Sequence, residues 1–216
     1  MRGRCQASDA PDRARQVGRL GVFGGTFDPI HIGHLIIAEE ARVKLGLERV
    51  IFVPAGKPWL KEHRDIAPGE HRIEMIRLAI AANPRFSVST VDLDRAGPSY
   101  TVHTLPDLRR ELGGEVDFYF ILGIDALAGL PLWKEPEGVV EMCHLVAARR
   151  PGAGALDLES LERSMPGISS RIIFLDNPLV DISSTDIRER VAAGLPIADL
   201  VPDAVARYIG EQGMYK

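Results

Sequence analysis

The feature of this sequence that most constrains its fold is a series of short apolar runs separated by segments with helical periodicity. The runs lie at residues 20–23, 50–53, 118–122, 145–148 and 172–175. They do not alternate between apolar and polar residues, which is typical of parallel strands that are buried on both faces. Residues 86–91 do alternate, with Phe86 and Val88 on one side, and this pattern predicts a less buried strand.

Helical patterns fill the intervals between these runs. They lie at residues 35–45, 73–80, 101–112 and 184–193. Alternating strands and helices predict the α/β class, with a Rossmann-like, doubly wound parallel sheet and a small C-terminal helical part. In a sheet of this kind, ligands bind at the carboxyl ends of the strands.

Length and composition fit one domain of this class. The chain has 216 residues, of which 45% are hydrophobic and 26% are charged, so it can bury a sizeable core. Residues 1–18 are polar and lack apolar periodicity. We therefore expect a disordered leader at 1–18 and a single domain at 19–212.

Charge and cysteine content argue against several classes of function. The net charge is −4, which disfavours bulk binding of nucleic acid or anionic membranes. No apolar run approaches the roughly 20 residues that span a bilayer. The two cysteines provide neither a disulfide framework nor a four-ligand zinc cluster. We expect a cytoplasmic protein with no nucleic-acid or membrane partner.

The most informative segment is 24–35, Gly-Gly-Thr-Phe-Asp-Pro-Ile-His-Ile-Gly-His-Leu, which follows a predicted strand and enters a predicted helix. A helix N-terminus at this place can hold an anion. Gly24 and Gly25 let the backbone approach a ligand closely and allow a positive φ angle, and Thr26 offers a hydroxyl and an amide. Asp28 is expected to hydrogen-bond the backbone of the loop. The segment therefore predicts a phosphate-binding loop.

Two histidines of this segment are candidates for chemistry. His31 and His34 are three residues apart and share one face of the first helical turn, and Gly33 between them leaves room for a ligand. Either histidine alone is more often structural than catalytic, but the pair after a strand and a double glycine favours a role in a reaction. A zinc site is a poor alternative because no third or fourth ligand has a suitable spacing.

A second phosphate site is predicted at residues 181–188, Asp-Ile-Ser-Ser-Thr-Asp-Ile-Arg. Ser183, Ser184 and Thr185 are good N-cap residues, and Ser184 and Arg188 share one helix face because they are four residues apart. Hydroxyls, free amides and an arginine fork at a helix start can clamp a triphosphate. Taken alone, the segment fits a capped surface helix with an exposed arginine equally well.

A long loop is predicted at residues 55–69. Its 15 residues include two prolines, two glycines and many charges. Loops of this length are often lids or binding loops, and we expect this one to close over bound ligand. A surface excursion without function is the alternative.

Taken together, these motifs resemble those of a known family. Segment 24–35 is similar to the signature of the bacterial nicotinate-mononucleotide adenylyltransferases, which belong to the nucleotidyltransferase superfamily with an His-x-Gly-His motif. Segment 182–188 resembles the second signature of that family. Further segments that resemble the family contain Lys61, Tyr100, Thr101, Gly123, Asp125, Trp133 and Arg149.

The resemblance implies an activity, its substrates and its site residues. It implies transfer of the adenylyl group of ATP to nicotinate mononucleotide, with catalytic roles for His34, His31 and Arg188. It also implies Mg²⁺ carried by the phosphates of ATP, without a metal ligand from the protein. The residues implied for ATP binding are Gly25, Thr26, Phe27, His34, Gly123, Asp125, Ile182, Ser183, Ser184, Thr185 and Arg188. Those implied for the mononucleotide are Gly24, Gly25, Thr26, Lys61, Tyr100, Thr101, Trp133 and Arg149.

Several alternatives stay open at this point. One is another nucleotidyltransferase of the superfamily, with nicotinamide mononucleotide or phosphopantetheine as acceptor. Another is a non-catalytic ATP-binding sensor on the same fold. A dinucleotide-binding dehydrogenase is disfavoured because no Gly-x-Gly-x-x-Gly follows a predicted strand. The sequence leaves the oligomeric state open, a homo-oligomer included.

Overall fold

The computed structural model describes residues 18–58, 65–149, 154, 156–178 and 180–216. The described strands form one sheet in the order β3-β2-β1-β4-β5-β6, and every neighbouring pair is parallel. The strands are β1 (Gly18–Gly25), β2 (Arg49–Pro54), β3 (Phe86–Val88), β4 (Val116–Gly123), β5 (Cys143–Ala148) and β6 (Ile172–Leu175). The order reverses direction between β1 and β4, which confirms the predicted Rossmann-like, doubly wound α/β sheet.

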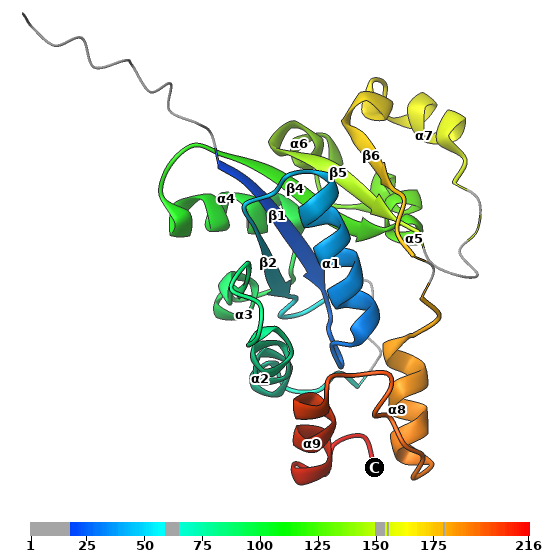
Figure 1. The fold of residues 1–216 in the computed structure, drawn as a ribbon. Helices are drawn as coiled ribbons and strands as arrows, with labels where there is room; N and C mark the ends of the chain where they lie inside the picture. The colour runs from blue at the N-terminus through cyan, green and yellow to red at the C-terminus, as the bar shows by residue number, and fades with distance from the viewer. Residues whose placement is uncertain (1–17, 59–64, 150–153, 155, 179) are drawn as a thin grey trace, which may run out of the picture.

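Helices pack against both faces of this sheet (Figure 1). They are α1 (Ile32–Lys44), α2 (Gly69–Ile80), α3 (Val91–Asp94), α4 (Thr101–Leu112), α5 (Ile124–Ala128), α6 (Pro136–Met142), α7 (Leu158–Ser164), α8 (Ser184–Ala192) and α9 (Asp203–Glu211), with the short 3-10 helices η2 (Leu130–Leu132) and η3 (Ile168–Arg171). Helices α8 and α9 lie at the end of the sheet toward which β1 and β2 point (Figure 1). The predicted C-terminal helical part is therefore confirmed.

Successive residues of the central strands face two separate cores. In β4, Phe118 and Phe120 belong to a cluster that includes buried residues of α4, α5 and α6. Tyr119 and Ile121 belong to a second cluster, on the other face, that includes residues of α1, α2 and α9. Because both faces are buried, each strand is apolar along its whole length, as the sequence indicated.

The structure differs from the sequence prediction at two places. The folded region is longer than 19–212, because β1 begins at Gly18 and Met214 is buried in the core. The strand predicted at 86–91 ends at Val88, because the carbonyl of Thr90 already accepts the helical hydrogen bonds that open α3. The predicted leader up to residue 17 lies outside the described residues.

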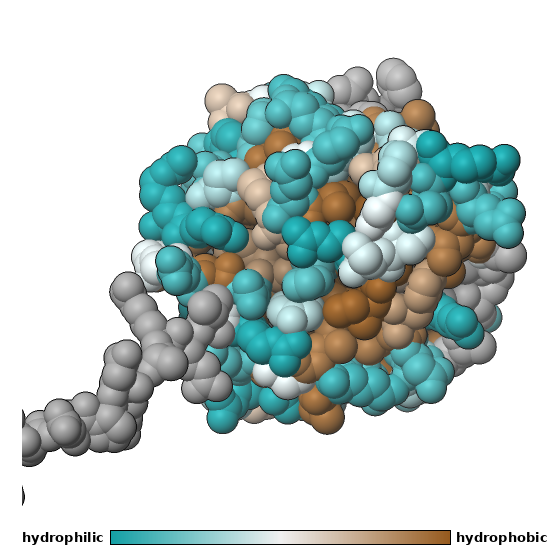
Figure 2. Space-filling model, turned by 90° about the horizontal axis from the view of Figure 1, so that it is seen from above, coloured by the Kyte–Doolittle hydropathy of each residue, from teal (hydrophilic) through white to brown (hydrophobic). Residues whose placement is uncertain are grey.

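The molecular surface shows areas of hydrophobic residues surrounded by hydrophilic ones. Figure 2 shows this pattern for the face seen from above. Single exposed apolar side chains are ordinary on a folded domain. Within the part of the chain that the structure describes, no helix is long and apolar enough to cross a membrane.

A close backbone approach at Gly56 joins three segments beside the carboxyl end of the sheet. A β-carbon at Gly56 would lie 2.3 Å from the carbonyl oxygen of Asp92 in α3. The Gly56 amide donates to Ser99 Oγ over 2.8 Å, just before α4. Gly56 thus holds the chain after β2 against α3 on one side and against Ser99 on the other.

We expect Gly56→Ala to destabilise the fold by about 1–3 kcal/mol, because the added methyl group overpacks against backbone. The matched control is Gly210→Ala in α9, where no described atom lies within 4 Å of the added β-carbon. That variant should be neutral or more stable by up to about 1 kcal/mol, since alanine is the better helix former. Urea unfolding of both variants is the measurement. Equal midpoints for Gly56→Ala and the wild type would contradict this account of the junction.

Candidate active site

A cleft of about 610 Å³ lies at the carboxyl ends of β1 and β4, where the strand order reverses. This is the place at which a doubly wound sheet binds its ligands. The cleft brings together most of the site residues that the sequence predicted. Those lining it are Gly24, Gly25, Thr26, Phe27, His31, His34, Gly123, Asp125, Arg149, Ile182, Ser183, Ser184, Thr185 and Arg188.

The glycines of the first loop make room for aromatic rings. A β-carbon at Gly24 would lie 2.8 Å from Phe120 Cζ, and one at Gly25 would lie 2.9 Å from Phe27 Cζ. Gly24 and Gly25 do not use the positive φ that glycine allows, and Phe27 has the positive φ in this loop, at 49°. Phe27 keeps this strained conformation because its ring is buried and packs edge-on to His34, with 5.0 Å between ring centroids. Burial of Phe27 therefore fixes the shape of the loop.

The two histidines open helix α1. His31 is the N-cap residue, and its ring stacks on that of His34 with 3.6 Å between centroids. The His31 amide donates to His34 Nδ1 over 3.2 Å. An accepting ring nitrogen carries no proton, so neutral His34 carries its proton on Nε2. His34 thus has a hydrogen-bond donor on a side chain that lines the cleft.

Gly33 lines the cleft beside the two histidines. A β-carbon at Gly33 would lie 3.1 Å from His31 Nδ1, so the missing side chain also leaves space for the His31 ring. The ligand expected beside Gly33 stays a prediction.

Helix α8 is joined to the first loop by two hydrogen bonds. Ser184 Oγ donates to the Pro29 carbonyl over 2.9 Å, and Arg188 Nη1 donates to the Asp28 carbonyl over 2.7 Å. Ser183 Oγ caps the helix by accepting from the Asp186 amide over 3.1 Å. These contacts place both predicted phosphate motifs in one site. The alternative of a capped surface helix with an exposed arginine is disfavoured, because Arg188 is half-buried and bonded to the first loop.

Asn177 is a site residue that the sequence motifs missed. Its Oδ1 accepts from the Arg149 amide, and its Nδ2 donates to the Arg149 carbonyl, each over 2.9 Å. The side-chain amide thereby continues the pairing of β5 with β6 beyond Ala148 and Leu175, and it holds Arg149 at the cleft. The only signal in the sequence is an asparagine shortly after an apolar run, where strands end.

Three of the residues implied for the mononucleotide form a separate group. Tyr100, Thr101 and Trp133 do not line the cleft described above. Trp133 lies edge-on to Phe120, with 6.0 Å between centroids, and Lys134 Nζ lies 5.0 Å from the centre of the Tyr100 ring. The buried Nε1 of Trp133 has no hydrogen-bond partner among the described residues. Lys61 lies outside the described residues.

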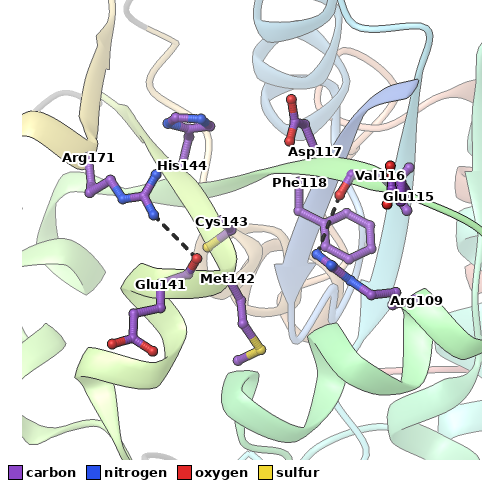
Figure 3. Close-up of a pocket in the computed structure, with 10 residues that line it drawn as sticks. All are labelled: Arg109, Glu115, Val116, Asp117, Phe118, Glu141, Met142, Cys143, His144 and Arg171. Atoms are coloured by element: carbon purple, nitrogen blue, oxygen red, sulfur yellow. Dashed lines mark hydrogen bonds between the residues drawn. The ribbon is translucent and has the colours of Figure 1, made fainter. Parts of the chain in front are cut away.

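A second cavity of about 410 Å³ lies at the opposite end of the sheet, where β4 and β5 begin (Figure 3). Its arginines are bonded to backbone: Arg109 donates to the Val116 carbonyl over 3.4 Å, and Arg171 to the Glu141 carbonyl over 3.3 Å. Burial raises the pKa of the Cys143 thiol to about 12, so the thiol stays protonated and unreactive at neutral pH. None of the predicted site residues lines this cavity. The carboxyl-end cleft is therefore the candidate active site.

Comparison with known proteins decides the family. A family model described as cytidylyltransferase-like matches residues 22–190. A protein from Roseiflexus sp. (strain RS-1), named probable nicotinate-nucleotide adenylyltransferase, is 50% identical over 197 residues, which are 91% of this chain and 98% of that protein. The chain belongs to the nicotinate-nucleotide adenylyltransferase family. A relative of the same name from Acidothermus cellulolyticus is 48% identical over 202 residues, 92% of this chain and 94% of the relative.

Solved structures support the fold of this family. Plasmodium falciparum nicotinic acid mononucleotide adenylyltransferase, in a complex with NaAD, matches with a TM-score of 0.72. The match covers 92% of this chain and 97% of that one at 20% sequence identity. A putative nicotinate-nucleotide adenylyltransferase from Vibrio parahaemolyticus matches with a TM-score of 0.65, at 16% identity over 92% of this chain and 96% of that one. The resemblance found in the sequence is thereby confirmed.

Gly123 gives a direct test of the cleft. It is the N-cap residue of α5, with φ −72° and ψ 152°, a conformation that any residue adopts. No described atom lies within 4 Å of an added β-carbon, so a side chain at Gly123 would occupy cleft space. We expect Gly123→Val to raise the KM for ATP at least about tenfold, a loss of roughly 1.4 kcal/mol of binding.

The thermal midpoint of Gly123→Val is measured beside its KM, so that weaker ATP binding is distinguished from a weaker fold. Gly123→Ala should give an intermediate KM. An unchanged KM for ATP in Gly123→Val would show that the nucleotide lies elsewhere.

Proposed function

We infer that this enzyme transfers the adenylyl group of ATP to nicotinate mononucleotide, giving nicotinate adenine dinucleotide and pyrophosphate for NAD biosynthesis. The observation that carries this inference is the junction of the two phosphate motifs. Arg188 and Ser184 are bonded to the first loop, and His34 lines the same cleft. The relatives that share this sequence over nine tenths of its length carry the name of this activity.

We assign the phosphate contacts from this geometry. A phosphate monoester is already a competent nucleophile, so the enzyme needs no general base and works by positioning two polyanions and stabilising charge. His34 donates from Nε2 to the α-phosphate in the transition state, and His31 supports its placement through the stacked rings. Arg188, with the amides of Ser184 and Thr185 and the Thr185 hydroxyl at the start of α8, holds the leaving pyrophosphate.

The remaining assignments divide the two substrates. Gly25, Thr26 and Phe27 contact ATP phosphates, and Gly123, Asp125, Ile182 and Ser183 surround the rest of ATP, since all seven line the cleft. Gly24, Gly25, Thr26 and Arg149 face the mononucleotide from the same cleft, and Tyr100, Thr101 and Trp133 hold its ring. Gly24 packs on Phe120, which contacts Trp133, so the two groups adjoin. The roles of Lys61 and of the 55–69 lid stay predictions.

We propose that Mg²⁺ enters the cleft with ATP. Phosphate oxygens and water are the ligands that Mg²⁺ prefers at nucleotide sites, and the ion neutralises phosphate charge. Of the carboxylates that line the cleft, that of Asp28 is held by hydrogen bonds from Tyr215 and Ala67. A cytoplasmic location, where ATP is made and used, and a homo-oligomer stay predictions.

Replacement of His34 by alanine should lower kcat by about 10²–10³, because one transition-state donor is lost. His144→Ala is the matched control, since His144 lies at the opposite end of the sheet and stacks on Tyr119. It should leave kcat within a factor of about two. Steady-state pyrophosphate release measures both variants. A His34→Ala enzyme with more than half of the wild-type kcat would remove His34 from the reaction.

The acceptor should be the acid, nicotinate mononucleotide, rather than the amide. Thr101 begins α4, whose N-terminus has no side-chain cap, so its first amides and the helix dipole favour a carboxylate. A carboxamide would point its NH₂ group at the same donors, and a mispaired buried group costs about 1–3 kcal/mol, or roughly 10–100-fold in kcat/KM.

A panel of acceptors tests this function. Pyrophosphate release is measured with ATP and nicotinate mononucleotide, nicotinamide mononucleotide or phosphopantetheine. We expect the highest kcat/KM with the nicotinate compound. Equal rates with the amide would refute the ring-pocket assignment, and preference for phosphopantetheine would indicate another member of the superfamily. No release with any acceptor would favour an ATP-binding sensor.

A further inference from the structure

Asp28 lies in the first phosphate loop, but its side chain bonds two other segments of the chain and none of the residues assigned to phosphate. It is 4% exposed. Its Oδ1 accepts from the Tyr215 hydroxyl over 2.6 Å, and its Oδ2 accepts from the Ala67 amide over 3.3 Å. The expectation that Asp28 bonds the backbone of its own loop is wrong, because its backbone partner, Ala67, lies in a different segment of the chain. One residue of the loop therefore joins the segment after α9 to the segment before α2.

The backbone of the same residue carries the second motif. The Asp28 carbonyl is the acceptor for Arg188 Nη1, the side chain assigned to the leaving pyrophosphate. The position of the Asp28 peptide therefore sets the position of Arg188 relative to His34, which follows six residues later. Anything that orients Asp28 also adjusts the distance between the two phosphate-binding groups.

We propose that Tyr215 is a positioning residue for adenylyl transfer, acting through Asp28 on the first phosphate loop and on Arg188. The inference rests on the proposed function. The Tyr215 hydroxyl donates its hydrogen bond to Asp28, which is assigned no substrate contact, and this bond is the route by which Tyr215 acts.

Several features of Tyr215 support this role. Its backbone has a φ of 63°, in the left-handed region that a bulky residue adopts only when its surroundings hold it there. Its side chain is partly buried and packs against one of the two hydrophobic cores. Burial raises the pKa of its hydroxyl, and the hydrogen bond and charge of Asp28 raise it further, so the phenol stays a donor at physiological pH. The phenol can therefore donate to Asp28 under assay conditions.

Tyr215→Phe removes the hydroxyl and keeps the ring. We expect kcat to fall about tenfold, or roughly 1.4 kcal/mol in transition-state stabilisation, with the KM for ATP within about threefold of the wild type. We expect kcat to change more than the KM for ATP because the amide contacts that bind ATP in the ground state remain. The position of Arg188 relative to His34, which matters in the transition state, becomes less well fixed. A residue that only anchors the end of the chain would change thermal stability and leave kcat unaltered.

The matched control is Tyr208→Phe in α9. The Tyr208 hydroxyl lies 2.8 Å from His71 Nδ1, between α9 and α2 and outside the cleft. This variant loses a hydroxyl of the same kind from the same part of the molecule. Its kcat should remain within a factor of about two.

A double-mutant cycle separates the route through Asp28 from a general loosening. Asp28→Ala, which removes both acceptor oxygens, Tyr215→Phe and the combined variant are assayed for kcat and for the thermal midpoint. We expect the combined variant to be no slower than Asp28→Ala alone, because both changes break the same link. Three results would each overturn the proposal. The first is a combined variant whose loss of kcat equals the product of the two single losses. The others are a Tyr215→Phe kcat within twofold of the wild type, and a lower thermal midpoint with an unchanged kcat per folded molecule. A wild-type protein that releases no pyrophosphate would instead reject the proposed function.

Discussion

The loops that build the cleft converge on one buried charge, the guanidinium of Arg72. The side chain is 2% exposed and donates to the carbonyls of Thr26, Ala55 and Ala67 over 2.8 to 2.9 Å. Burial lowers the pKa of Arg72, and the nearby charge of Asp28 opposes that shift. A buried cation is tolerated only when its donors are bonded and a counter-charge is close. These conditions hold only when the ends of β1 and β2 meet the start of α2.

The phosphate chemistry follows from this convergence. With Thr26 and Asp28 fixed, the first loop presents its amides and the opening of α1 to the cleft, and its carbonyls anchor α8 through Ser184 and Arg188. A chain with a net charge of −4 thereby gathers Arg188, two histidines and a helix N-terminus at one place. The attraction for polyanions is local, which suits a reaction between two phosphorylated substrates.

Contacts with neighbouring residues fix the positions of side chains that we assign to the reaction. His34 is fixed by the amide of His31 and by the ring of Phe27, and Arg149 is fixed by the side-chain amide of Asn177. An enzyme whose nucleophile needs no activation accelerates the reaction mainly by positioning its substrates and charged groups. The residues that hold these groups therefore matter to the rate as well as to the fold.

The sequence by itself determined the sheet, its parallel strands and the two phosphate motifs. Apolar runs buried on both faces, helical periodicity and short glycine and serine patterns are local signals, and residues 24–35 and 182–188 carry the family signature without any knowledge of the fold. The roles of Gly24, Gly25 and Gly33 were decided by the tertiary structure, which fills the space beside them with the rings of Phe120, Phe27 and His31. The same holds for Asn177 and for the bond between Tyr215 and Asp28, 187 residues apart. Such contacts depend on the packing of side chains from distant segments, and no periodicity or spacing within one segment encodes which rings and hydroxyls will meet there.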